Sequence, residues 1–397
     1  MKKTNASPSA SPTACWTCDM KAVYLAFLAP LLFSASLIAQ PQLTPQAQAS
    51  LMTVAPGTEL YSTFGHSALR IHDEALQVDR IYNYGTFDFD QPNFYLNFCR
   101  GKLLYMLDRE PYASFVRGNL LERREMKEQV LALSPEQVQS LFNYLENNAL
   151  PANRNYKYDF FYDNCATRIR DAVETVLERD WEVDSSSLAS GTTMRQLLRP
   201  YLKPHPWTQF GIDLVLGMPT DREATARTFV FLPDHLSDAF GGAQLSNGAA
   251  LVARTKALPA DAPYPSSSLP ILPMPAVLLF TLLGLLSLLH PIAERVFDAV
   301  FWTLIGVAGV IIFLLWFFTD HQATKGNLNI FWAQPWHILA FLFQKGKVAR
   351  YFYLVSFALA ALFILLWPFL PQEFPWEAGP LAALVAFKSM RYYRKAL

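Results

Sequence analysis

The sequence predicts an exported α+β domain followed by a C-terminal α-helical transmembrane region. Three apolar runs, at 271–289, 296–318 and 351–369, are each close to the roughly 20 residues with which a helix spans a bilayer. The segment before them contains both strand-like and helix-like patterns. Residues 20–40 have the form of an export signal. Together these observations indicate an integral membrane protein.

The composition excludes one class of partner. The 397 residues are 52% hydrophobic and 14% aromatic, which is high for a soluble protein. Lys and Arg number 33, as do Asp and Glu, so no net charge points to nucleic acid or another acidic polymer. We therefore expect no nucleic-acid partner.

The N-terminal stretch reads as a secretory signal peptide. An apolar core at 22–33 follows a lysine, and small residues lead to Ala39, so the mature chain is expected to begin near Gln40. An uncleaved first membrane anchor is the alternative, but the apolar core is short for a span. Cys15 and Cys18 form a CxxC without a second pair, and we assign them no function.

The domain organisation follows from these signals. Residues 1–39 are an extension and signal peptide, 40–256 an exported domain, 257–270 a Pro/Ser linker and 271–397 a transmembrane domain. The last of these has three to five spans, since two shorter apolar segments, 329–343 and 379–387, either cross the membrane or are re-entrant or interfacial. If both cross, the basic clusters at 345–350 and 388–395 fall in the cytoplasm, as the positive-inside rule requires.

Local patterns predict several elements of the exported domain. Residues 66–71 alternate as a strand does, and the aromatic-rich segment 80–89 is a second, adjacent strand. A helix begins after Ser134 as N-cap, with proline next and glutamine three residues after the cap. We read the charged run 122–128 as a solvated strand or turn face.

Cys165 is the candidate nucleophile. Asp163 and Asn164 are good helix caps directly ahead of it, and the apolar residues that follow have helical spacing. At a helix N-terminus the partial positive charge and free N–H groups favour the thiolate. The same N–H groups suit the oxyanion of an acyl-transfer intermediate.

A thiolate nucleophile needs a proton carrier, and His66 on the first predicted strand is the candidate. Two alternatives stay open: Cys165 forms a disulfide with Cys99, or His66 is a structural residue. We expect Cys165 to be free. The remaining histidines have no comparable setting and are taken as structural or surface residues: His72, His205, His235, His290 and His337.

Several segments resemble one known family. They include "FGHSALRI", "YNYGTFDF", "NYKYDFFYDNCATRIRD", "LGMPTDREAT" and "TDHQATKGNLNIFWAQP". These are similar to the Bacteroides-type lipoprotein N-acyltransferase family, and the likeness extends from about residue 45 to the C-terminus. The resemblance implies a circularly permuted papain-like (NlpC/P60-like) fold, with Cys165 as nucleophile and His66 as acid and base.

The resemblance also implies a third polar group that orients the imidazole. The strand after His66 offers Asn83 and Asp88; we choose Asn83, although strand register is not fixed by one sequence. Asp320 and His321 return to the side of the catalytic domain. They are candidates for the border of a lipid-facing, substrate-binding cleft, or they cap a span at the interface.

The activity that the resemblance implies is a two-step acyl transfer in the bacterial inner membrane, with the catalytic domain in the periplasm. Cys165 takes an acyl chain from a phospholipid as a thioester and passes it to the N-terminal amine of an S-diacylglyceryl cysteine on a lipoprotein. No metal, nucleotide or other cofactor is required. Two other classes stay open: a cysteine peptidase or amidase acting on peptidoglycan, and a non-catalytic envelope scaffold.

Overall fold

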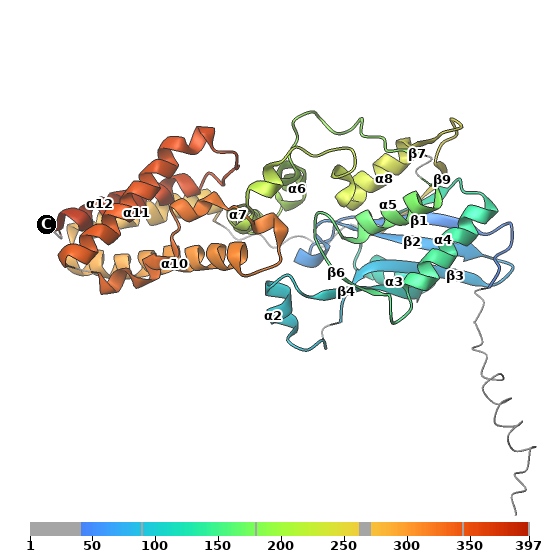
Figure 1. Cartoon of the computed structure of the whole chain (residues 1–397), viewed down its shortest axis with the longest axis horizontal. Coiled ribbons are helices and arrows are strands. Elements are labelled where there is room, and N and C mark those ends of the chain that lie inside the picture. The colour runs from blue at the N-terminus through green and yellow to red at the C-terminus, as the bar shows by residue number, and fades with distance from the viewer. Residues whose placement is uncertain (1–40, 89, 179–180, 262–270, 344, 396–397) are drawn as a thin grey trace, which may run out of the picture. The chain divides into compact units, whose positions relative to one another are not determined.

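The structure is a computed structural model of the chain, and it describes residues 41–88, 90–178, 181–261, 271–343 and 345–395. The predicted signal peptide, with Cys15 and Cys18, lies outside the described residues, as does most of the predicted linker. The described part contains a mixed α/β region with a large sheet, followed by a helical region with apolar helices (Figure 1). This agrees with the α+β and transmembrane prediction.

A seven-stranded antiparallel sheet organises the α/β region, in the order β6-β4-β3-β2-β1-β5-β9. β7 and β8 form a second, two-stranded antiparallel sheet. The strands are β1 (Gln48–Val54), β2 (His66–Asp73), β3 (Val78–Thr86), β4 (Leu104–Pro111), β5 (Met126–Leu131), β6 (Asn155–Lys157), β7 (Trp181–Glu182), β8 (Gln244–Leu245) and β9 (Val252–Leu258).

Successive side chains of a strand point to opposite faces of the sheet. Both faces carry buried apolar residues, and helices cover both. On one face, Leu51 and Leu69 share a core with α4, α5 and α8. On the other face, Met52 and Ala68 pack with Phe115 of α3. The helices of this region are α2 (Phe94–Cys99), α3 (Tyr112–Leu121), α4 (Pro135–Asn148), α5 (Cys165–Val176), α6 (Met194–Leu202), α7 (Pro206–Val215) and α8 (Pro233–Gly242), with 3-10 turns η1 (Leu60–Ser62), η2 (Met218–Asp221) and η3 (Phe229–Phe231).

Two of the expected elements form as predicted from local signals. The helix after Ser134 is α4, and Ser134 and Gln137 make a reciprocal capping box. β2 begins at His66 and continues to Asp73. The second predicted strand, 80–89, is β3, but it starts at Val78 and ends at Thr86, where the pairing with β4 shifts register.

Two expectations need correction. The run 122–128 is not a solvated face, because Arg124 and Glu128 are both buried and β5 begins at Met126. Glu128 is buried with a partner, since Arg70 donates to it at 2.8 Å. The predicted linker, 257–270, begins too early: β9 pairs with β5 as far as Leu258.

The C-terminal region is helical. α10 (Pro291–Phe317) and the segment Gly346–Phe369 are long and apolar enough to cross a membrane, whereas Pro273–Leu289 is shorter. The predicted short span at 329–343 is not an α-helix; it forms 3-10 turns that pack along α10. The remaining elements are α9 (Pro273–Leu286), α11 (Gly346–Leu366), α12 (Ala378–Lys395), η4 (Ser287–Leu289), η5 (Gln322–Thr324), η6 (Leu328–Phe331), η7 (Pro335–Leu342) and η8 (Trp367–Phe369).

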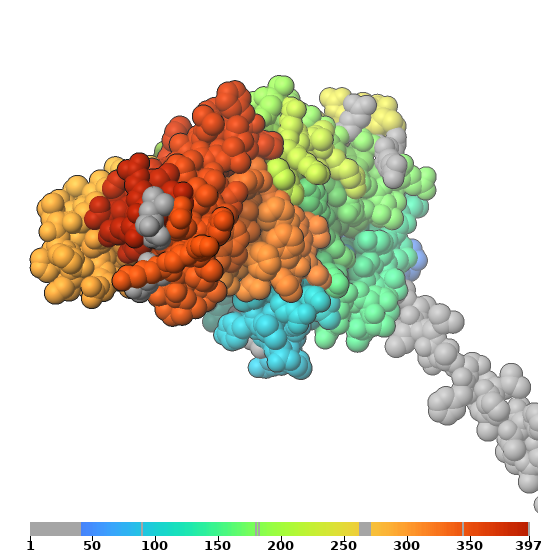
Figure 2. All heavy atoms as spheres, turned by 60° about the vertical axis from the view of Figure 1, so that its left-hand side comes forward, coloured from blue at the N-terminus to red at the C-terminus, as the bar shows by residue number. Residues whose placement is uncertain are grey.

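Hydrogen bonds connect the segment after α10 with the sheet-bearing region. The N–H of Asp320 donates to the Arg100 carbonyl just after α2, at 2.8 Å. Asn327 donates to the Leu214 carbonyl at the end of α7, also at 2.8 Å. Figure 2 shows the atoms around α2 (cyan) beside the orange atoms of this C-terminal segment. Residues far apart in sequence therefore meet next to α2.

Candidate active site

Cys165 is the first residue of α5, and a capping box fixes its backbone. The Asn164 side chain accepts from the N–H of Thr167 at 2.9 Å, and the Thr167 hydroxyl accepts from the N–H of Asn164 at 2.8 Å. The Asn164 amide also donates to the carbonyls of Phe160 and Phe231, at 2.8 Å each. Because Asn164 is buried and fully bonded, the start of α5 is held rigidly against the core.

His66 is the first residue of β2, at the end of the sheet that faces the start of α5. The neighbouring strand β3 has a bulge there, between Tyr84 and Thr86, with Gly85 at φ +91°. A side-chain carbon on Gly85 would lie 3.7 Å from Cβ of Cys165 and 4.0 Å from Cε1 of His66. These are ordinary van der Waals distances, so the positive φ of the bulge, rather than lack of space, favours glycine at this position.

His66 and Cys165 interact directly and change each other's proton affinity. Burial lowers the pKa of His66, but the charge and hydrogen bond of Cys165 outweigh it and the pKa is raised. Burial raises the pKa of the Cys165 thiol, but His66 and the N–H groups of Ser67 and Ala166 outweigh it and the pKa is lowered. Both shifts favour a thiolate–imidazolium pair, the form a nucleophilic cysteine needs.

Asn83 holds the other side of the imidazole. His66 Nε2 lies 2.5 Å from Asn83 Oδ1, and since an amide oxygen only accepts, Nε2 carries the proton and Nδ1 is left for Cys165. Asn83 Nδ2 donates to Glu110 Oε1 at 3.3 Å, which orients the amide. Asp88, the other candidate, is exposed and instead accepts from the N–H of Asp90.

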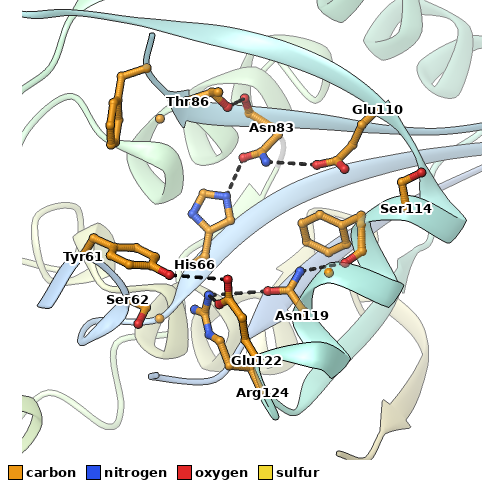
Figure 3. A pocket seen from close by; sticks show the side chains of 15 residues that line it. Tyr61, Ser62, His66, Asn83, Thr86, Glu110, Ser114, Asn119, Glu122 and Arg124 are labelled. Carbon is orange, nitrogen blue, oxygen red and sulfur yellow. Dashed lines mark hydrogen bonds and ion pairs between the residues drawn. The ribbon is translucent and has the colours of Figure 1, made fainter. Parts of the chain in front are cut away.

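Two cavities meet at His66. The first, of about 330 Å³, is the more polar of the two and lies between His66 and α3. Figure 3 shows Asn83 and Glu110 on one side of the imidazole and Arg124 and Glu122 on the other. Arg124 is buried, and its Nη1 donates at 3.4 Å to Glu122, while one of its terminal nitrogens has no partner among the described residues.

The second cavity, of about 740 Å³, holds Cys165 and is mainly apolar. Aromatic and aliphatic side chains dominate its wall, which includes Phe64, Phe94, Phe98, Leu103, Tyr105, Tyr158, Phe161, Ile212, Phe231 and Leu232. Burial, followed by the charge of Cys165, raises the pKa of Tyr158, so its phenol stays protonated. Asp320 and His321 line this cavity too. His321 Nε2 contacts the Phe98 carbonyl at 3.1 Å, and Asp320 pairs with Lys157 at 3.6 Å.

The structure thus brings His66, Cys165 and Asn83 together, with Asp320 and His321 at the wall of the apolar cavity. Cys99 and Cys165 are both free, so the disulfide alternative is wrong. Sequence reasoning missed Glu110, which lies on β4 and reaches Asn83 only through the strand pairing. Within the described ranges, no cluster of three or more His, Cys, Asp or Glu residues has the arrangement of a metal site.

Two family models match the chain. Residues 39–200 match the family model of the Lnb N-terminal periplasmic domain, and residues 266–397 match that of the Lnb transmembrane domain. Neither a curated protein nor a solved structure matches the chain. The first match includes His66, Asn83 and Cys165, and the second includes Asp320 and His321. The chain therefore belongs to the Lnb family, as a membrane protein with a periplasmic domain.

Proposed function

We propose that this protein is a lipoprotein N-acyltransferase of the bacterial inner membrane. It moves an acyl chain from a phospholipid, through a thioester on Cys165, to the N-terminal amine of an S-diacylglyceryl cysteine lipoprotein. The family match and the order of His66 before Cys165 along the chain support this reaction class.

One observation carries the proposal: the Cys165–His66 pair faces a large apolar cavity in a chain that also has membrane-spanning helices. A wall of aromatic and aliphatic side chains suits an acyl chain, because it removes apolar surface from water. A peptide from the cell wall is polar and charged, and the same wall would leave its amide groups without partners. The geometry therefore favours a lipid substrate over a peptidoglycan peptide.

The first half-reaction forms the thioester. The Cys165 thiolate attacks the ester carbonyl carbon, and the free N–H groups at the start of α5 suit the oxyanion that develops. The carbon–oxygen bond then breaks, and the His66 imidazolium gives its proton to the departing alkoxide of the lysophospholipid. The products are lysophospholipid, an S-acyl Cys165 and a neutral imidazole.

The second half-reaction forms the amide. The neutral amine of the lipoprotein's N-terminal cysteine attacks the thioester carbonyl, and His66 takes the proton that the nitrogen loses. The carbon–sulfur bond breaks, so the thiolate–imidazolium pair is restored with a triacylated lipoprotein as product. Asn83 keeps the imidazole in the tautomer that serves both steps.

Reconstitution tests the proposal. The purified full-length protein in phospholipid vesicles, given a synthetic diacylated lipopeptide, is expected to add one acyl chain to the α-amine, as measured by intact mass. Without the acceptor, Cys165 should carry the mass of one acyl chain, and hydroxylamine should remove it. An acceptor with an acetylated N-terminus is the control and should gain nothing. Hydrolysis of the phospholipid without acylation of the lipopeptide would contradict the proposal.

A further inference from the structure

One group of exposed side chains has no explanation in the catalytic chemistry. We call it the rim: Leu60 and Tyr61 in η1, and Tyr95, Leu96 and Phe98 in α2. Tyr61 and Tyr95 are 71% and 78% exposed, and α2 has no buried residue at all. A six-residue helix with this much exposed apolar surface is not stable in water by itself. Something apolar is therefore expected to cover the rim.

The position of α2 indicates that the lipid bilayer covers the rim. α10 ends at Phe317, and three residues later the N–H of Asp320 donates to Arg100 directly after α2. The contact is close, because a side-chain carbon on Gly101 would lie 3.0 Å from the backbone nitrogen of His321. α2 is thus tied to the end of a helix long and apolar enough to cross the membrane, which places it at the level of the bilayer interface.

The charges around α2 fit this position. Arg100, Lys102 and Lys157 are exposed next to it, and Lys157 is only weakly engaged, at 3.6 Å from Asp320. Aromatic side chains at the acyl boundary with basic side chains beside them are typical of segments that lie in the membrane interface. The basic groups match the phosphates of lipid headgroups in charge.

The rim also connects the interface with the candidate nucleophile. Leu60, Tyr61, Tyr95 and Phe98 line the same apolar cavity that holds Cys165. The lining of this cavity therefore includes both exposed apolar residues of the rim and Cys165. An acyl chain that passed over the rim would stay in contact with apolar groups along its way.

We propose that the rim inserts into the periplasmic leaflet and that the apolar cavity opens sideways into the hydrocarbon, so that an acyl chain reaches Cys165 without crossing water. The insertion is independent of the reaction, whereas the role of the cavity as an acyl path rests on the proposed function. The two parts call for separate measurements.

Depth in the bilayer tests the insertion. With all four native cysteines replaced by serine, the full chain in phosphatidylcholine–phosphatidylglycerol nanodiscs carries a nitroxide at Tyr95→Cys, Leu76→Cys or Leu314→Cys. Leu76 lies in the β2–β3 turn, at the other end of the sheet from His66, and Leu314 is an exposed residue of α10. Oxygen concentrates in the hydrocarbon, whereas a water-soluble nickel complex stays in water. We expect oxygen to relax the label at 95 as it relaxes the label at 314, and the nickel complex to relax the label at 76. Water-like relaxation at 95 overturns the insertion.

Activity tests the path. Phe98→Asp places a charge in the leaflet and is expected to lower acyl transfer about tenfold. Leu76→Asp, which adds the same charge outside both cavities, is the control and should retain transfer. Alkylation of Cys165 by small, water-soluble iodoacetamide should be unchanged in both variants, which shows that the site is intact. Full transfer by Phe98→Asp overturns the path. If the wild-type protein transfers no acyl chain, the proposed function fails, and the nitroxide measurement still decides the insertion.

Discussion

The two cavities that meet at His66 differ in their chemistry. On the α3 side, carboxylates, amides and Arg124 surround the imidazole; on the Cys165 side, the wall is mainly aromatic and aliphatic. His66 lines both cavities, and its Nε2 bonds to Asn83 on the more polar side, which leaves Nδ1 for the thiol. A site that passes an acyl chain between two amphipathic substrates has use for both environments. The difference suggests that the apolar cavity selects the chain, while the polar one controls the proton.

Replacing the nucleophile should give the largest effect. Cys165→Ser keeps the capped helix start, but a hydroxyl is hardly ionised near neutral pH, so acyl transfer should fall by about 10³-fold or more. The purified variant should melt at the wild-type temperature and accumulate normally in the membrane. Cys99→Ser changes the other, exposed cysteine and is the matched control, with activity retained. Full activity of Cys165→Ser would rule out the thioester.

His66→Ala should remove the thiolate as well as the proton carrier. In the wild-type protein the lowered pKa of Cys165 means that its alkylation by iodoacetamide persists below the pH at which an ordinary thiol loses reactivity. Without the imidazolium, burial remains and raises the pKa, so the midpoint of the alkylation profile should move to higher pH. Peptide mapping measures it, with Cys99 as the internal reference. An unchanged profile would mean that the helix N-terminus alone sustains the thiolate.

Filling each cavity in turn tests whether they have different roles. Ala323→Phe narrows the apolar cavity, and since each methylene that no longer fits costs about 1–3 kcal/mol, the product with the longest acyl chain should fall about tenfold or more. Ser114→Phe narrows the polar cavity and should slow transfer without changing the chain-length distribution. Mass spectrometry of the acylated lipopeptide, made from mixed-chain phospholipids, distinguishes the two. Equal shifts in both variants would contradict the division of roles.

The parts of the site that the sequence predicts are those set by local signals. Asn164, one of the two predicted caps, is the N-cap of α5, and alternation specifies β2, so Cys165 and His66 can be placed before any tertiary contact is known. The choice of Asn83 over Asp88 could not rest on strand register, because the end of β3 depends on a bulge against β4. Glu110 could not be found at all, since only strand register brings it to Asn83.

Long-range packing explains the other differences. Arg124 and Glu128 look like surface charges in the sequence, but they are buried among partners from distant segments. The segment 329–343 is apolar enough for a short span, yet it packs along α10 as 3-10 turns. In both cases the residue types fit two environments. The choice depends on contacts with residues 58 or 69 positions away, or with a separate helix. No local pattern carries that information.

The smallest effects should come from the polar cavity. Asn83→Ala removes the hydrogen bond that holds the imidazole, worth about 1.4 kcal/mol, so kcat/KM should fall about tenfold. Glu110→Gln keeps an oxygen that accepts from Asn83 Nδ2 but removes the charge. Because Glu110 is only half-buried, we expect a loss of about two- to fivefold.

The pH profile separates a positioning role for Glu110 from a merely structural one. The charges of Glu110 and His66 interact, and a carboxylate near His66 favours the imidazolium. Removing it should lower the pKa of His66. The basic limb of kcat/KM, where the acid that protonates the leaving group is lost, should then move to lower pH. Glu110→Ala should show the same shift with a larger loss, because Asn83 then also loses its orienting acceptor. Glu122→Gln, in the same cavity but bonded to Arg124 and Tyr61, is the matched control. If Glu110→Gln and Glu122→Gln shift the basic limb equally, the effect belongs to the general field of the polar cavity, and Glu110 has no specific role at Asn83.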